Sequence, residues 1–585
     1  MATTVKLAEY LFTRLHQLGI RAIHGVPGDY NLTLLDYIEP AGIHWVGNCN
    51  ELNAGYAADG YARIKGIGAL ITTFGVGELS TINAIAGAYC ERAPVVHIVG
   101  TPDRDAQDSR ATVHHTFNDG NFGRFAQMHA HITVALANLR NLHSAPSQID
   151  AVLKECIVHS RPVYIQVPVD LVDAPVPSGS LWTDCLSLKS MSRGPEVPSS
   201  MLDSALSMVL EKIQSAKQPV ILVDGETRAL GITEDVQSIV EFTNWPTWVT
   251  TFGKGLVDET APNVYGVYRG SYDPRAKAFV DSSDLVLCFG PHYSSTNTFD
   301  YTSIPPKTVT ISFTDTEVRS GERVFRDVPA RIAVSQLRQQ LSALKFKTGG
   351  TYDIDMACGN DTTLSAFSSV HSKDAIKQDR LWRFLANLIR PGDIVMGETG
   401  TAGYGVQEFR LPRYSRVFAP TTWLSIGYML PAAQGAALAQ RDLIGSSDYH
   451  GLDQARTMVF IGDGSLQMTI QELGTIIRER LDVTIFLINN DGYTIERCIH
   501  GLNKTYNDIG RWRYPQAPHF FGADQDVFTA TALTWEDLQN VLEAMEDRTD
   551  GGLRMIEIVL DRQDVPVGPL LDLLVEERKA VERES

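Results

Sequence analysis

The sequence predicts an α/β protein built from three doubly wound parallel-sheet domains. Three observations lead to this prediction. A chain of 585 residues is too long for one hydrophobic core. Short β-branched runs that end in glycine alternate with helical patterns, which is typical of a parallel sheet covered on both faces. The same alternation occurs in three successive stretches of the chain.

The first stretch covers residues 1–180. It opens with leucines at helical spacing, which stop at Gly19. A further helix is expected over residues 51–65. Apolar runs at residues 69–74, 95–99 and 163–167 are expected to be buried strands. The proline-rich segment 168–198 is expected to be an extended connector.

The second and third stretches cover residues 200–345 and 370–565. The second contains strand-like runs at residues 220–223, 285–289 and 309–313. The third contains runs at residues 394–396, 458–461, 483–488 and 555–560. Between them, the polar segment 348–369 is expected to be another connector. Residues 566–585 are expected to form a tail with an amphipathic helix.

Composition excludes several classes of function. Lys and Arg number 51 against 69 Asp and Glu, a formal net charge of −18. This balance argues against nucleic acid or an anionic membrane as a partner. No apolar run reaches membrane-spanning length and no apolar leader opens the chain, so we expect neither membrane insertion nor secretion. Seven cysteines, never spaced C-x-x-C, favour reduced thiols in a cytoplasmic protein and argue against zinc.

Polar residues follow two predicted strands of the third stretch. The first strand ends in Gly462-Asp463-Gly464-Ser465, and the second ends in Asn489-Asn490-Asp491-Gly492. The carboxyl ends of parallel strands form the ligand-binding edge of such a sheet. The Asp463 carboxylate, the Asn490 amide oxygen and a carbonyl near Gly492 are hard ligands that suit Mg²⁺ when diphosphate oxygens complete the shell. Each motif alone could be a tight turn, but two at buried strand ends favour a diphosphate and metal site.

The sequence resembles the pyruvate decarboxylase group of thiamine-diphosphate enzymes over nearly its whole length. The resemblance is carried by the metal motif above and by six further motifs: Gly25–Asn31, Asn50–Arg63, Thr72–Ser80, His114-His115-Thr116, Glu398–Thr401 and Asp491–Glu496. It implies a pyrimidine-binding (Pyr) domain over residues 1–180, a central domain over 200–345 and a diphosphate-binding (PP) domain over 370–565. Thiamine diphosphate and Mg²⁺ are the implied cofactors.

The resemblance also implies roles for individual residues. Glu51, which could otherwise be a first-turn carboxylate facing a helix dipole, would hydrogen-bond N1′ of the aminopyrimidine and activate the cofactor. Asp29, His114, His115 and Glu496 would handle protons around the reacting carbon. Ile426, otherwise a plain core residue, would wedge between the two cofactor rings. The implied cofactor contacts are Glu51, Thr399, Thr401, Leu424, Ile426, Asp463, Gly464, Ser465, Asn490, Gly492, Tyr493 and Thr494. The implied metal ligands are Asp463, Asn490 and Gly492.

The implied reaction is non-oxidative decarboxylation of a 2-oxo acid, either pyruvate or a larger one, to an aldehyde and CO₂. In the family, Glu51 and the histidines meet Asp463, Asn490 and Glu496 of a second chain, which implies a dimer or tetramer with shared active sites. The main alternative is a carboligase that forms acyloins from the same intermediate. A flavin-dependent oxidase and a protein that keeps the fold without catalysis are further alternatives, and the complete set of catalytic groups argues against the last.

The sequence departs from the family pattern at several positions. Leu424 stands where glycine is common, and only its carbonyl is expected to contact the cofactor. Yeast-type enzymes carry a regulatory cysteine where this chain has Gly225-Glu226-Thr227, and Arg92 replaces a histidine-containing loop. Gly403 and Thr296 are smaller than the side chains in pyruvate-specialised relatives, so we expect acceptance of larger 2-oxo acids.

Overall fold

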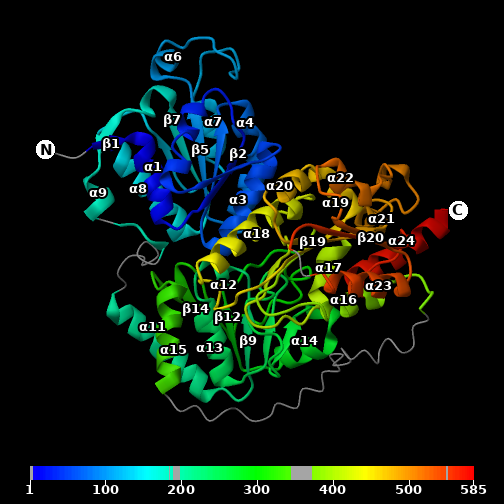
Figure 1. The fold of residues 1–585 in the computed structure, drawn as a ribbon. Coiled ribbons are helices and arrows are strands. Elements are labelled where there is room, and N and C mark those ends of the chain that lie inside the picture. The colour runs from blue at the N-terminus through cyan, green and yellow to red at the C-terminus, as the bar shows by residue number, and fades with distance from the viewer. Residues whose placement is uncertain (1–3, 184, 189–197, 344–371, 549–550, 585) are drawn as a thin grey trace.

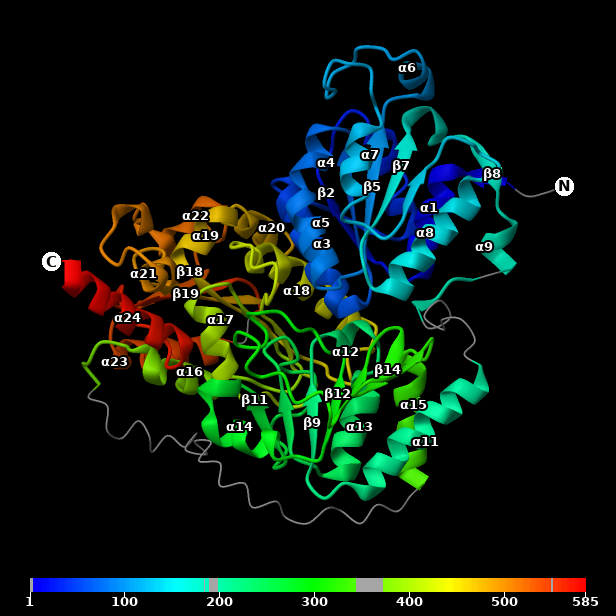
Figure 2. The ribbon, with the colours of Figure 1, turned by 180° about the vertical axis from the view of Figure 1, so that it is seen from behind.

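Three sheets form the body of the molecule and confirm the predicted fold class. The computed structural model describes residues 4–183, 185–188, 198–343, 372–548 and 551–584. Each of three parts of the chain contains one large sheet covered by helices (Figures 1 and 2). These are the amino-terminal part (blue to cyan), the central part (green) and the carboxyl-terminal part (yellow to red). None of the helices in these ranges is both long and apolar enough to cross a bilayer.

The amino-terminal sheet has six parallel strands in the order β3-β2-β4-β5-β7-β6. Their bounds are β2 (Ala22–Gly25), β3 (His44–Gly47), β4 (Gly68–Thr73), β5 (Val95–Thr101), β6 (Leu136–Asn138) and β7 (Val163–Pro168). The predicted helix is α3 (Glu51–Lys65). Its ends follow from local signals, because the Asn50 side chain accepts the N–H of Asn53 and Gly66 adopts a left-handed φ of 94°.

The central sheet differs from the prediction at one edge. Its order is β11-β10-β9-β12-β13-β14-β15, and β14 and β15 run antiparallel. The two edge strands are joined by Gly321 and Glu322, and Gly321 has the positive φ that such tight hairpins require. The strands are β9 (Pro219–Val223), β10 (Thr247–Val249), β11 (Val264–Val267), β12 (Leu285–Phe289), β13 (Thr310–Phe313), β14 (Glu317–Ser320) and β15 (Arg323–Arg326).

The carboxyl-terminal sheet again has six parallel strands, in the order β17-β16-β18-β19-β21-β20. They are β16 (Ile394–Gly397), β17 (Arg416–Phe418), β18 (Thr457–Gly462), β19 (Val483–Asn489), β20 (Phe528–Ala532) and β21 (Arg554–Val559). The predicted tail helix is α24 (Pro569–Glu584), which packs against α21 (Thr494–Ile499). The predicted connector at 348–369 lies outside the described residues.

The predicted connector at 168–198 is only partly extended. Within it, β8 (Pro175–Pro177) pairs antiparallel with β1 (Thr4–Lys6), and α9 (Gly179–Thr183) follows. The sequence did not predict this pairing, because prolines usually argue against a strand. They are tolerated on edge strands, and both strands of a two-stranded ribbon are edges.

The first and last domains of the chain meet through two helices. Helix α3 lies against α18 (Met429–Gly445) between the blue and yellow parts of Figure 1. The approach is so close that a Cβ on Gly435 would lie 1.8 Å from the Ala57 carbonyl oxygen, and one on Gly60 would lie 2.0 Å from that of Ala432. Glycine at both positions therefore sets the distance between the helices.

Candidate cofactor and active site

The adjacent strands β18 and β19 bring the two predicted metal motifs together. They pair in parallel, with Gly462 opposite Ile488, so both motifs lie at the carboxyl edge of the sheet. Asp463 begins α19 (Asp463–Thr469) and is 1% exposed. Its carboxylate accepts the backbone N–H groups of Gly464 at 2.9 Å and Gly492 at 3.0 Å.

The amide of Asn490 completes a cluster of oxygen atoms. Its oxygen lies 2.9 Å from the Gly492 carbonyl oxygen and 3.2 Å from Asp463 Oδ1, and its nitrogen faces the Thr494 hydroxyl. Three oxygens this close repel one another unless a cation lies among them; with the amide turned over, its nitrogen would instead donate to the other two. Octahedral Mg²⁺ with bonds of ~2.1 Å holds adjacent ligand oxygens roughly 3 Å apart. The donor set and its spacing fit Mg²⁺.

Burial also changes the acidity of Asp463. Loss of hydration raises the pKa of this carboxyl to about 6, although the two backbone hydrogen bonds favour the charged form. An uncompensated carboxylate here is therefore costly. A divalent cation would remove that cost, because it binds only the ionised carboxyl.

The loop after β19 is held in an unusual backbone conformation. Asp491 and Gly492 have φ values of 57° and 127°. The buried Arg497 fixes this loop by donating to the Asp491 carbonyl at 2.7 Å and the Asn507 carbonyl at 3.1 Å. The sequence reading did not single out Arg497, since a basic residue in a helix is usually solvated.

Three further predicted cofactor residues surround this loop. The Tyr493 ring lies against Gly464, where a Cβ would come within 2.6 Å of Cε1. The hydroxyl of the buried Thr494 donates to the Arg562 carbonyl at 3.2 Å. Ser465 is also buried, and its hydroxyl is 3.5 Å from the Thr399 carbonyl oxygen.

The end of β16 supplies Thr399, Thr401 and the buried acid Glu398. Glu398 lies in one of the sequence motifs, but no role was predicted for it. The Oε1 and Oε2 atoms of Glu398 accept the N–H groups of Thr399 at 2.8 Å and Met429 at 2.9 Å. Burial raises the pKa of Glu398 to about 7. The Thr399 hydroxyl is buried without a hydrogen-bond partner, so it is free to contact a bound phosphate. Thr401 is buried at the start of α17 (Thr401–Gly405).

Leu424 and Ile426 lie in the loop between β17 and α18. Both side chains are half-buried. Leu424 has a φ of 54°, in the left-handed region where a non-glycine residue costs about 1–2 kcal/mol. This conformation gives a physical reason for the glycine that the resemblance implies at this position.

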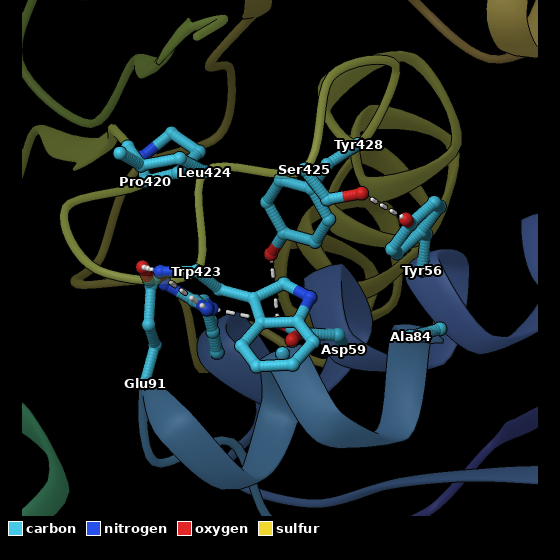
Figure 3. Close-up of a pocket in the computed structure, with 11 residues that line it drawn as sticks. Tyr56, Asp59, Ala84, Glu91, Pro420, Trp423, Leu424, Ser425 and Tyr428 are labelled. Carbon is cyan, nitrogen blue, oxygen red and sulfur yellow. Dashed lines mark hydrogen bonds and ion pairs between the residues drawn. The ribbon is translucent and has the colours of Figure 1, made fainter. Parts of the chain in front are cut away.

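The amino-terminal domain of the same chain holds this loop in place (Figure 3). Glu91 Oε1 accepts the N–H groups of Thr421 at 2.9 Å and Thr422 at 3.1 Å. The hydroxyls of Tyr56 and Ser425 point toward one another and are 2.7 Å apart. These contacts span more than 300 residues of sequence, which is why the motifs gave no sign of them.

Glu51 is the first residue of α3 and lies beside Gly77. A Cβ on Gly77 would be 3.1 Å from Glu51 Oε1, a tight contact, so glycine leaves this carboxyl more room than another residue would. The carboxyl is half-buried, and loss of hydration raises its pKa. A carboxyl that keeps its proton more readily than usual suits the role that the resemblance implies for it.

Asp29, His114 and His115 form a second cluster, with ligand atoms within 4.8 Å of one another. His114 Nε2 is hydrogen-bonded to Asp29 Oδ2, and His115 Nε2 lies 3.9 Å from Asp29 Oδ1. The Tyr30 ring stacks on His114 with centroids 4.9 Å apart. An imidazole pair held by a carboxylate can accept and return protons near neutral pH.

Within a single chain, the cluster of Asp463 and Asn490 is not connected to the cluster of Asp29 and the two histidines. Glu496 is exposed on α21. Among the described residues, no hydrogen bond or ion pair connects it, Asp463 or Asn490 to Asp29, Glu51 or the two histidines.

Comparison with known proteins identifies the family. Family models described as thiamine pyrophosphate enzyme match three segments: the N-terminal TPP binding domain over residues 5–122, the central domain over 206–341 and the C-terminal TPP binding domain over 398–558. The chain is 53% identical over 568 residues to a pyruvate decarboxylase of Aspergillus parasiticus, covering 96% of both chains.

The chain belongs to the pyruvate decarboxylase family of thiamine-diphosphate enzymes. It is also 40% identical to a pyruvate decarboxylase of Aspergillus fumigatus, over 96% of this chain and 95% of that one. Pyruvate decarboxylase isozyme 3 of Saccharomyces cerevisiae is 37% identical over 96% of each chain. The resemblance inferred from the motifs is confirmed, as are thiamine diphosphate and the reaction class: the chain is a carboxy-lyase acting on a 2-oxo acid. Its relatives do not favour the carboligase alternative.

Arg92, one of the departures from the yeast-type pattern, links two domains in this member of the pyruvate decarboxylase family. Its guanidinium pairs with Glu226 at 3.1 Å and Asp315 at 2.8 Å, both in the central domain. Loss of hydration disfavours the charge of this buried arginine, but the two carboxylates outweigh it and keep the pKa of Arg92 above its usual value. An ion-pair network therefore joins Arg92 and Glu226, two positions at which the sequence was expected to depart from the yeast-type pattern.

Proposed function

We propose that the chain converts a 2-oxo acid to an aldehyde and CO₂ at a site where Asp463, Asn490 and the Gly492 carbonyl hold Mg²⁺. The convergence of these three oxygens at the ends of β18 and β19 carries the proposal. The buried hydroxyl of Thr399 and the backbone at Gly464 support a diphosphate group beside the metal. When bound, thiamine diphosphate would supply a nucleophilic carbon and would accept the electron pair that the departing CO₂ leaves behind.

The chain's own residues would bind the substrate and move its protons. Glu51, with its raised pKa, would hold a proton at the pyrimidine N1′ atom. The pair of His114 Nε2 and Asp29 would deliver a proton to the reacting carbon, with His115 beside it. The Leu424 carbonyl would receive the 4′-amino group, and Ile426 would keep the two rings bent toward each other.

Replacing Glu51 tests this assignment. Glu51→Gln keeps the shape of the side chain but removes the ionisable group, so kcat should fall by about 10²–10⁴-fold. Glu155→Gln, a change at a carboxyl on α8 (Ala145–His159) whose side chain is 46% exposed, is the control and should keep wild-type kcat. Aldehyde release would be followed in the presence of saturating thiamine diphosphate and Mg²⁺. Unchanged turnover in Glu51→Gln would refute the role of Glu51.

A second copy of the chain would complete each site. The separation of the two clusters within one chain supports this, as do exposed apolar side chains beside both. Val76 and Phe117, near the Asp29 cluster, are 53% and 48% exposed; Met468 and Trp512, near the metal cluster, are 47% and 45% exposed. Apolar surface beside a catalytic cluster is typical of an interface.

Co-expression of two inactive variants tests the shared site. A dimer of one Glu51→Gln chain and one Asp463→Asn chain would combine both substitutions in one site and leave the other intact. Random pairing should then restore about a quarter of wild-type activity, whereas each variant alone stays inactive. A site built within one chain would give no recovery, and light scattering would report the oligomeric state.

The substrate would include 2-oxo acids larger than pyruvate. Thr296 supports this, because its hydroxyl donates to the Thr421 carbonyl and its small side chain therefore lies beside the loop of Leu424. Thr296→Phe should lower kcat/KM for phenylpyruvate relative to pyruvate by about tenfold or more. A wild-type preference for pyruvate above about a hundredfold would contradict the proposal.

We further infer a cytoplasmic location, which the six free thiols among the described cysteines support.

A further inference from the structure

A cavity of 480 Å³ lies where the three domains meet, and its walls are strongly cationic. Lys65 from the end of α3, Arg228 from α12 (Glu226–Ala229), Arg331 from α15 (Ala330–Ala343) and Arg416 from the start of β17 all line it. Asp448 is the one carboxylate in the lining. This concentration of positive charge occurs in a chain whose formal net charge is −18.

Backbone carbonyl groups fix the arginine side chains of this cationic cavity. Arg228 donates to the Arg92 carbonyl at 2.7 Å. Arg331 donates to the Leu230 carbonyl at 3.2 Å, and Arg416 to that of Ser415 at 3.0 Å. A carbonyl orients a guanidinium but does not neutralise it, so Arg228 and Arg416 retain their charge.

Neighbouring carboxylates compensate little of this charge. Asp448 is exposed and accepts the Ser446 hydroxyl at 2.8 Å. Glu234 at the start of α13 (Thr233–Thr243) is exposed, and Asp442 on α18 accepts the Tyr61 hydroxyl at 2.9 Å. Among the described residues, no carboxylate forms an ion pair with Lys65, Arg228 or Arg416.

Burial without a counter-charge is unfavourable for these groups. Loss of hydration lowers the pKa of Lys65 and Arg416, and it lowers the pKa of Arg228 to about 10. The arginine side chains keep their charge at neutral pH. Half-buried cations of this kind are normally balanced by an anion.

We propose that this cavity binds a small molecule that carries a phosphate group. Several guanidinium groups facing one space match phosphate oxygens, to which arginine can donate two hydrogen bonds at once. The volume is in the range of small-molecule sites and exceeds what inorganic phosphate alone would fill. His450, whose ring stacks on Tyr414 at 4.3 Å, offers a flat surface at the rim of the cavity.

This site is separate from the cofactor site. Lys65 and Glu51 are the two ends of the 15-residue helix α3, which puts their backbones about 20 Å apart. Arg416 begins β17, and the chain continues from there into the loop of Leu424 and Ile426. A ligand held in the cavity would therefore contact α3, which begins with Glu51, and β17, which leads into the loop of Leu424 and Ile426.

Calorimetric titration of the holoenzyme tests the proposal. The enzyme would be saturated with thiamine diphosphate and excess Mg²⁺, at ionic strength held constant with NaCl, and titrated with inorganic phosphate, glucose 6-phosphate or ADP. We expect saturable binding of at least one phosphate ester. Tighter binding of glucose 6-phosphate or of ADP would identify the kind of ester, whereas binding of inorganic phosphate alone would overturn the proposed larger ligand.

Substitutions connect binding to the cavity. The double variant Arg228→Gln with Arg416→Gln should weaken binding at least tenfold. If the double variant does not fold, Lys65→Gln is measured in its place and should weaken binding to a smaller degree. Arg326→Gln removes an exposed positive charge on β15 and should bind as wild type does. Absence of saturable binding by all probes, or equal affinity in wild type and the cavity variants, would overturn the proposal.

Discussion

The contact between α3 and α18 predicts a severe effect of adding a single methyl group. Gly435 lies in the interior of α18, and a Cβ there would be 1.8 Å from the Ala57 carbonyl oxygen. A Cβ and an oxygen normally stay more than about 3 Å apart, so Gly435→Ala must push the two helices apart by about 1 Å. The obstructing atom belongs to the backbone, so no rotamer change can relieve the clash.

The magnitude follows from two opposing effects. Overpacking of a tight interface costs about 1–3 kcal/mol, and the contact of Gly60 with Ala432 would be lost as well. Alanine in place of glycine returns at most about 1 kcal/mol through helix propensity. We therefore expect a net loss of about 1–2 kcal/mol and a fall in the unfolding temperature of roughly 2–4 °C for each kcal/mol lost by a domain of this size. Since α3 begins with Glu51, kcat should fall too.

A second glycine in α18 provides the control. Gly445 is the last residue of the helix, and nothing lies within 4 Å of a Cβ built on it. Gly445→Ala should leave kcat unchanged and should keep or slightly raise the unfolding temperature. Scanning calorimetry and steady-state kinetics on both variants provide the comparison. If Gly435→Ala unfolds at the same temperature as Gly445→Ala, the close helix approach is wrong.

Three further changes test the site. The pKa of Asp463 is about 6 against an ordinary 3.8, so the stability that this carboxyl gives the unliganded protein is complete below pH 3.8 and is lost as pH rises through 6. Denaturant melts should show the wild type losing about 1.3 kcal/mol relative to Asp463→Asn between pH 5 and 7. Parallel pH profiles of the two proteins would contradict this. Leu424→Gly should relieve the positive φ and raise the free energy of unfolding by about 1 kcal/mol with kcat retained; a loss of both would show that the leucine side chain matters. Arg497→Met should free the loop at Asp491 and Gly492 and weaken binding of Mg²⁺ and thiamine diphosphate at least tenfold by calorimetry, whereas the exposed Lys504→Met should not.

Elements with complete local signals could be predicted from the sequence. The helix from Glu51 to Lys65 was expected at its observed bounds, and in the structure Asn50 caps its start and Gly66 follows its end. The metal motifs were expected side by side because each ends a buried strand. The antiparallel edge at β14 and β15 was missed, since it departs from the alternation of strand and helix that guided the reading.

The groups that position the site could not be read from local motifs. Glu91 meets the loop at Thr421 across 330 residues, and Arg497 acts through backbone carbonyls that leave no trace in residue type. The strain at Leu424 is likewise a backbone property. A motif records which chemical groups are present, whereas these contacts depend on how distant segments pack.

One class of residue does report distant packing from within the sequence. Glycine in a helix interior costs about 1 kcal/mol relative to alanine, so a helix keeps it only where a side chain would not fit. Gly55 and Gly60 in α3 and Gly435 in α18 are such residues, and each lies where a Cβ would come within 2.6 Å of an atom in another helix. The glycines inside the motif of Glu51 thus indicate that other helices pack closely against α3.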